Sequence, residues 1–119
     1  MQGATPTPEH APIRRVASVI RVPAENLEEY KRYHQAVWPD VLRALSQANV
    51  TNYSIYRHGD LLFSYLEYRG ADYEGDMARI AEDEATRRWW AIMMPLQRTL
   101  RADPADPWWV ELEELFHLD

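Results

Sequence analysis

The sequence predicts an α+β fold in which a four-stranded antiparallel sheet has helices packed on one face. Short runs rich in β-branched and aromatic residues occur early, midway and late in the chain. Segments with apolar residues at every third or fourth position lie between them. A length of 119 residues suits one domain. We expect that domain to span residues 14–119, after a flexible tail at residues 1–13 that is rich in proline.

The first strand and the first helix follow each other directly. Val16–Val22 is short and β-branched, and Pro23 ends the run, so we expect a strand there. Beyond Glu25 the spacing becomes that of an amphipathic helix. One face of this helix carries Leu27, Tyr30, His34, Val37 or Trp38, Val41 and Leu45. Pro39 should kink this helix or begin a second helical segment, in which it is a first-turn residue.

A β-hairpin is expected in the middle of the chain. Asn52–Arg57 and Leu61–Tyr68 are rich in aromatic and aliphatic residues. The three residues between them contain Gly59, which suits a tight turn.

The last third of the chain should contain two helices, a loop and a strand. The helices are expected at Tyr73–Ala81 and at Glu84–Leu100, the second one bent by Pro95. The stretch 102–107 has two prolines and two aspartates, which indicates a loop. Val110–Leu118 alternates apolar residues like a strand, although its glutamates also permit a helix.

The order β-α-β-β-α-β that results is that of the ferredoxin-like fold, with its four-stranded antiparallel sheet. Helices on one face leave the other face of the sheet to be covered. A partner subunit is the simplest cover, because an exposed aromatic sheet face favours association.

The composition excludes several classes of function. The chain has no cysteine, so disulfides, thiol nucleophiles and cysteine zinc sites are absent, as suits a cytoplasmic protein. A net charge of −6 argues against nucleic-acid binding. The first residues contain no apolar run of the kind found in signal peptides or membrane spans. Outside position 34, the histidines His10, His58 and His117 lack the spacing of metal ligands, so we expect no metal.

The most informative pair for chemistry is Tyr30 and His34. Residues four apart on a helix project from the same face. A histidine has an ordinary pKa near 6.5, so it can accept and donate a proton near neutral pH. The same pattern also fits a histidine packed in the core, and spacing alone does not decide between the two.

Three further aromatic residues are candidates for binding. Trp89 and Trp90 diverge by about 100° around a helix, so one of them can be structural while the other lines a site. Indole rings stack on the C–H faces of sugars and donate hydrogen bonds to hydroxyls. Tyr53, in the expected hairpin, could reach a cavity that the sheet covers, and it also fits ordinary cross-strand packing.

These segments together resemble the L-rhamnose mutarotase family, over roughly Val16 to Leu118. The blocks that carry the resemblance occur in the family's order: Glu28-Glu29-Tyr30-Lys31-Arg32-Tyr33-His34, Val37-Trp38-Pro39, Asn52-Tyr53-Ser54-Ile55-Tyr56, Leu61-Leu62-Phe63 and Arg88-Trp89-Trp90. Two features depart from the family pattern, namely Ala48-Asn49 in place of a His-Gly turn and a longer segment before Arg14.

The resemblance implies a dimeric α/β barrel type of ferredoxin-like fold, in which two copies associate through their sheets. It implies an isomerase of carbohydrate metabolism that needs no cofactor and interconverts the α and β anomers of L-rhamnose by acid–base assisted ring opening. His34 matches the family's proton donor, and Tyr30, Tyr53, Trp89 and Trp90 match its sugar-binding residues.

Three alternatives remain open at this stage. The sugar can be L-fucose or another deoxy sugar instead of L-rhamnose. A ferredoxin-like dimer can also be a non-catalytic binder of small ligands or a cofactor-free monooxygenase. If the chain is an L-rhamnose mutarotase, we expect its partners to be a monosaccharide and a second copy of the chain. We expect it to bind neither nucleic acid nor a membrane.

Overall fold

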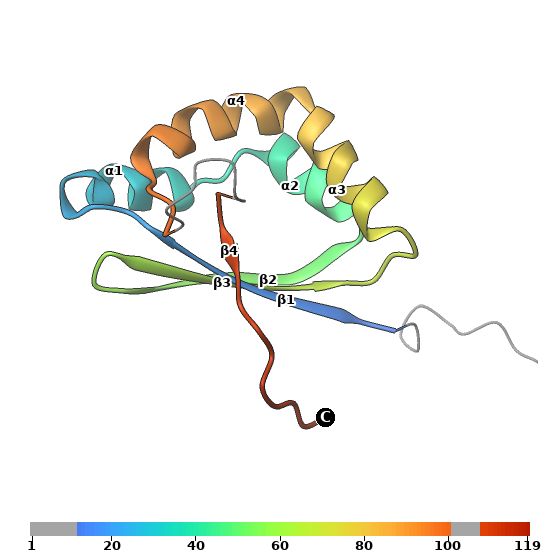
Figure 1. Ribbon diagram of the computed structural model, residues 1–119. Coiled ribbons are helices and arrows are strands. Elements are labelled where there is room, and N and C mark those ends of the chain that lie inside the picture. Colours follow the sequence, from blue (N-terminus) through green and yellow to red (C-terminus); the bar gives the residue numbers. More distant parts are fainter. Residues whose placement is uncertain (1–11, 101–107) are drawn as a thin grey trace, which may run out of the picture.

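The computed structural model describes residues 12–100 and 108–119, and its helices all lie on one face of a four-stranded antiparallel sheet (Figure 1). The expected tail, as far as residue 11, and the expected loop at 102–107 lie outside the described residues. The elements in chain order are β1 (Arg14–Arg21), α1 (Ala24–His34), α2 (Pro39–Gln47), β2 (Val50–His58), β3 (Leu61–Tyr68), α3 (Tyr73–Glu82), α4 (Glu84–Met93), the 3₁₀ turn η2 (Met94–Leu96) and β4 (Val110–Glu111). No described helix combines the length and hydropathy needed to cross a bilayer.

The sheet has the strand order β2-β3-β1-β4, and the expected antiparallel arrangement is confirmed. β1 pairs with β3 along its whole length, from Arg14 opposite Tyr68 to Arg21 opposite Leu61. The hairpin between β2 and β3 turns at Gly59, whose φ of 62° lies in the left-handed region that glycine adopts without strain.

The main core lies between the sheet and the helices. Alternate residues of a strand point to opposite faces, so Ile20, Val22 and Leu62 face the helices. They pack there against side chains from α1, α2 and α4, namely Tyr30, Val41, Trp89 and Met93. The apolar face expected on the first helix is therefore the face that the core buries.

Pro39 restarts the first helical stretch, as expected. α1 ends at His34 and α2 begins at Pro39, where the missing backbone N–H of proline costs no hydrogen bond. After α2 the chain turns at Asn49, with a φ of 67° that asparagine tolerates better than most residues.

The helix expected at Glu84–Leu100 is too long, and this prediction was wrong at its C-terminal end. α4 stops at Met93, and Pro95 lies in the η2 turn that follows it. Proline cannot donate the next helical hydrogen bond, and its ring clashes with the preceding turn. The chain therefore becomes extended, and Arg98 exchanges two backbone hydrogen bonds with Arg21, at N···O distances of 2.7 and 3.0 Å.

The strand expected at Val110–Leu118 is confirmed only at its start. β4 consists of Val110 and Glu111, opposite Val19 and Ser18, and the backbone N–H of Leu112 still donates to β1. The remaining residues leave the sheet edge without regular structure and extend away from the helices (Figure 1). A strand needs a ladder partner for every second residue, and here the pairing ends after two residues.

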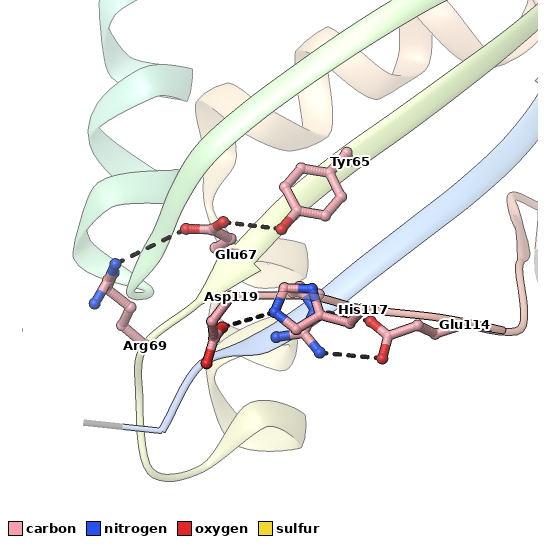
Figure 2. A network of polar contacts seen from close by, with 7 residues as sticks. Tyr65, Glu67, Arg69, Glu114, His117 and Asp119 are labelled. Carbon is pink, nitrogen blue, oxygen red and sulfur yellow. Dashed lines mark hydrogen bonds and ion pairs between the residues drawn. The ribbon is translucent and has the colours of Figure 1, made fainter. Parts of the chain in front are cut away.

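A polar network holds this C-terminal segment beside the face of the sheet that lacks helices (Figure 2). Glu114 accepts two hydrogen bonds from Arg15, at 2.8 and 3.0 Å. On β3, the hydroxyl of Tyr65 donates to Glu67 at 2.8 Å, and this bond is the main cause that lowers the pKa of the Glu67 carboxyl. Of these contacts, the exposed Arg15–Glu114 ion pair joins the segment to β1, and an exposed pair of this kind stabilises only modestly.

Candidate functional site

Tyr30 and His34 form the centre of the candidate site, in the last turns of α1. Their rings stack, with centroids 4.4 Å apart and planes inclined by 23°. Tyr30 is buried and His34 is half-buried. The four-residue spacing that made this pair notable in the sequence therefore becomes a direct contact.

The backbone of α1 fixes the tautomer of the neutral His34 ring. Nδ1 lies 2.9 Å from the carbonyl oxygen of Tyr30, which can only accept a hydrogen bond. Nδ1 must therefore carry a proton, and Nε2 is the nitrogen with the free lone pair. Burial lowers the pKa of His34, while the bond to the carbonyl opposes part of that effect. The ring is thus neutral at neutral pH, with Nε2 ready to accept a proton.

Trp89 forms an aromatic wall beside this pair. Its ring meets His34 edge to face, at a centroid distance of 5.3 Å and an angle of 72°. Trp38 and Tyr33 contact Trp89 in the same manner, at 5.2 and 5.9 Å. Trp89 is 6% exposed and Trp90 is 38% exposed, so the two adjacent indoles do diverge between core and surface, as the helical geometry requires.

Tyr53 faces the helices because β2 is irregular just before it. The register with β3 shifts between Thr51 and Ser54, and Asn52 has a φ of 47°. Without this bulge, Tyr53 would share the face of Thr51, opposite to that of Val50. The extra residue re-aims the strand, so that Ile55 packs against the core and Tyr53, two positions before it, lies on the same side and interacts with Tyr30. Tyr53 remains 42% exposed there.

A hydrogen-bond chain also reaches the hydroxyl of Tyr30. Gln97 Nε2 donates to the Tyr30 hydroxyl at 2.9 Å, and Gln97 Oε1 accepts from the indole N–H of Trp108 at 2.8 Å. Burial raises the pKa of Tyr30 to about 12, against a lowering by the Gln97 bond and with a smaller contribution from the nearby Tyr53. The Tyr30 hydroxyl therefore stays protonated at any physiological pH.

Gln97 and Trp108 were not among the residues expected at the site. The sequence assigned Gln97 to a helix that ends earlier in reality, so its inward position could not be foreseen. A signal was present in Pro95, which limits a helix, and in an aromatic pair that directly precedes the last strand.

The arrangement can perform acid–base chemistry on a small hydroxylated ligand. It combines an imidazole nitrogen with a free lone pair, a buried phenol, and aromatic rings that offer flat apolar faces. Of the five expected residues, Tyr30, His34 and Trp89 are in mutual proximity. Tyr53 enters through its electrostatic interaction with Tyr30, whereas Trp90 follows Trp89 on α4 and lies partly exposed at the surface.

Comparison with known proteins identifies the family of this chain. The family model for L-rhamnose mutarotase matches residues 15–118 of the chain. The chain belongs to the L-rhamnose mutarotase family. It is 36% identical to the L-rhamnose mutarotase of Listeria monocytogenes serotype 4b over 110 residues, covering 89% of this chain and 99% of that protein. It is 34% identical to that of Bacillus subtilis strain 168, covering 90% of this chain and 100% of that protein.

A solved structure supports the fold of this L-rhamnose mutarotase family member. The crystal structure of L-rhamnose mutarotase from Formosa agariphila matches with a TM-score of 0.69 at 24% identity. The match covers 89% of this chain and 99% of that one. At this level of identity the similarity concerns the arrangement of helices and strands.

Proposed function

We propose that this protein is an L-rhamnose mutarotase, an isomerase that interconverts the α and β anomers of the free sugar. The observation that carries the proposal is the stacked Tyr30–His34 pair, whose imidazole presents a free Nε2 beside the Trp89 wall. Membership of the family supports the same reaction.

Ring opening and ring closure each require two proton movements and no redox step. His34 Nε2 takes the proton of the anomeric hydroxyl, the bond between C1 and the ring oxygen breaks as C1 becomes the aldehyde carbon, and the resulting imidazolium gives the proton to the former ring oxygen. The open-chain aldehyde then rotates about its C1–C2 bond. The hydroxyl made from the former ring oxygen then attacks the other face of C1, and His34 takes its proton and gives it to the carbonyl oxygen, which closes the opposite anomer. One imidazole suffices for both steps, because Nε2 accepts the proton from one oxygen of C1 and, as an imidazolium, donates it to the other.

In this proposal the aromatic side chains hold the sugar. Trp89 and Trp90 offer indole faces to the C–H groups of the ring, while Tyr30 and Tyr53 offer hydroxyls to its oxygens. The exposure of two of these residues supports this role, since Tyr53 and Trp90 keep 42% and 38% of their surface free for contact, whereas Tyr30 and Trp89 are buried in the core. Holding the reacting atoms in place contributes to the rate independently of proton transfer.

The test is the rate of anomer exchange of L-rhamnose, measured by saturation-transfer NMR. Replacing His34 by alanine should reduce the catalysed exchange by about 10²- to 10⁴-fold, the usual contribution of a general acid–base residue. His58→Ala is the matched control, because His58 lies exposed at the end of β2, and it should leave exchange unchanged. Undiminished exchange in a folded His34→Ala protein would remove His34 from the mechanism.

The same assay decides which sugar is used. L-Fucose and other deoxy sugars are the alternatives, and they differ from L-rhamnose in the hydroxyls that the pocket must accept. We expect L-rhamnose to give the highest kcat/KM of the panel. A monooxygenase or a plain binding protein would accelerate exchange for none of the sugars.

We further propose that the fold is the ferredoxin-like one, that residues 14–119 are one domain, and that two copies associate through their sheets. The strand order β2-β3-β1-β4 supports the first point. Exposed apolar residues of the C-terminal segment support the association: Leu115 is 87% exposed, and Phe116 and Leu118 are each 80% exposed. A cytoplasmic location is also proposed, on the absence of cysteine, and cell fractionation would test it.

A further inference from the structure

The hydrogen-bond chain from Trp108 through Gln97 to Tyr30 has a fixed direction. Its three members come from distant parts of the chain: α1, the extended stretch after η2, and the residues before β4. Gln97 is 4% exposed and Tyr30 is 4% exposed, so the chain is shielded from water at its centre.

Trp108 determines the direction of the chain, because its indole N–H can donate a hydrogen bond but cannot accept one. The atom of Gln97 that lies 2.8 Å from this N–H must therefore be the amide oxygen. The amide nitrogen of Gln97 is then the atom that lies 2.9 Å from the Tyr30 hydroxyl. An amide nitrogen only donates, so the oxygen of Tyr30 is an acceptor in this bond.

This leaves the proton of the Tyr30 hydroxyl pointing away from Gln97. A phenol has one proton to donate, and the bond from Gln97 occupies one of its acceptor positions. The phenol also shares the ring stack with His34 and interacts electrostatically with Tyr53. The bond from Gln97 thus leaves the hydroxyl proton to be donated to a different group.

We propose that Trp108 and Gln97 are positioning residues that fix Tyr30 as a hydrogen-bond donor to an oxygen of the bound sugar. The inference rests on the proposed function and adds to it the residues that set the polarity of one contact. The backbone directly before Gln97 is tied to α1, because the side chain of Asn26 donates a hydrogen bond to the backbone oxygen of Leu96 at 3.2 Å.

Gln97→Glu tests the direction with almost no change in shape. The introduced carboxylate can only accept hydrogen bonds, so it would accept one from the Tyr30 hydroxyl as well as one from the indole N–H of Trp108. Tyr30 would then lose its donor function toward the sugar. We expect kcat/KM for L-rhamnose exchange to fall by about ten- to a hundredfold, and by a factor similar to that of Tyr30→Phe.

The double variant separates positioning from structure. If Gln97 acts through the Tyr30 hydroxyl, Gln97→Glu should cause no further loss in a Tyr30→Phe background. A merely structural role would reduce the rate by the same factor in both backgrounds, and that result would overturn the proposal. A monodeoxy derivative of L-rhamnose that lacks the oxygen contacted by Tyr30 should likewise be insensitive to Gln97→Glu.

Matched controls cover the chemical change and the folding risk. Gln47→Glu makes the same exchange at an exposed position of α2 and should leave the rate unchanged. Because a buried carboxylate can destabilise the fold, Trp108→Phe provides a second variant that introduces no charge. It should slow exchange in the wild-type background and have no effect in the Tyr30→Phe background, whereas Trp109→Phe should have no such background dependence.

A measurement without sugar distinguishes failure of this inference from failure of the proposed function. In ¹⁵N NMR spectra, Tyr30→Phe should shift the side-chain amide protons of Gln97 and leave the indole N–H of Trp108 hydrogen-bonded. Unmoved Gln97 amide signals would overturn the inference whatever the catalytic result. Absent exchange in the wild-type protein, together with the expected amide shift, would overturn the proposed reaction alone.

Discussion

At the scale of single residues, the proposed chemistry depends on how His34 and Tyr30 are protonated. His34 is a neutral ring with its proton held at Nδ1 by a backbone carbonyl, and Tyr30 is a phenol that burial keeps protonated. The two rings that touch thus have opposite roles, one with a free lone pair and one with a free proton.

The catalysed exchange should therefore depend on pH through one acidic limb. Burial lowers the pKa of His34 below its ordinary value of 6.5, so the base form is lost only as the pH falls below that value. Between about pH 4 and 8 we expect kcat/KM to rise with pH, to level off before neutrality and to remain level, since the pKa of Tyr30 is about 12. The measurement is NMR exchange with the uncatalysed rate subtracted at each pH. An inflection at or above 6.5 would contradict this account of the His34 environment.

At the scale of elements, the bulge in β2 decides which side of the sheet Tyr53 occupies. One extra residue reverses the alternation that follows it, so Asn52 controls the direction of a side chain one position away. The bulge also places the Asn52 side chain next to Glu67, where it helps to lower the pKa of that carboxyl, after the larger effect of Tyr65.

Substitutions of Asn52 should reveal this control. Glycine adopts a φ of 47° freely, so Asn52→Gly should retain the fold and most of the activity. Valine is strained at that angle, and Asn52→Val should cost about 1–2 kcal/mol of unfolding free energy. It should also raise KM for the sugar, because Tyr53 loses its direction.

Thermal unfolding and exchange kinetics provide the measurements for these variants. Ser54→Val is the matched control, since it places valine at the first position where regular pairing with β3 resumes. If both valine variants behaved alike, the bulge would have no special role in aiming Tyr53.

Most elements of the fold followed from the sequence, and the exceptions have physical causes. Hydrophobic periodicity located β1, the hairpin and the helices because these elements bury one face each. The end of α4 depends on Pro95, a residue visible in the sequence that can bend a helix as well as end it. The short β4 depends on where its ladder partner stops, which local patterns do not encode. Within the site, Tyr30 and His34 followed from their helical spacing. Gln97 and Trp108 meet through tertiary contacts between segments that have no common periodicity.

At the scale of the whole molecule, one face of the sheet has helices, and among residues 12–100 and 108–119 the C-terminal segment alone lies beside the other face (Figure 1). That second face bears a groove between β1, β3 and the segment, lined by Arg15, Ala17, Tyr65, Leu112, Glu113, Glu114, Phe116 and His117. Large apolar side chains next to it remain exposed in the single chain, which is a costly arrangement unless another surface covers them.

Removing these side chains should prevent association. Leu115→Ser combined with Phe116→Ser should convert a dimer into a monomer in analytical ultracentrifugation at micromolar concentration, because both side chains would be buried between copies. Leu42→Ser is the matched control, since Leu42 is 51% exposed on α2, on the helical side, and it should leave the mass unchanged. A monomeric wild-type protein would contradict the proposed association.

The end of α1 has a consequence for anyone who wishes to alter the catalyst. The group that selects the His34 tautomer is a main-chain carbonyl, present whatever residue occupies position 30. Substitution of other side chains therefore does not directly change which of the two ring nitrogens carries the proton. Such substitutions can tune the basicity of the ring through nearby charge or through the amount of water that reaches it, and the packing of Trp89 and Tyr30 against the ring is one such handle on the pH dependence of the proposed reaction.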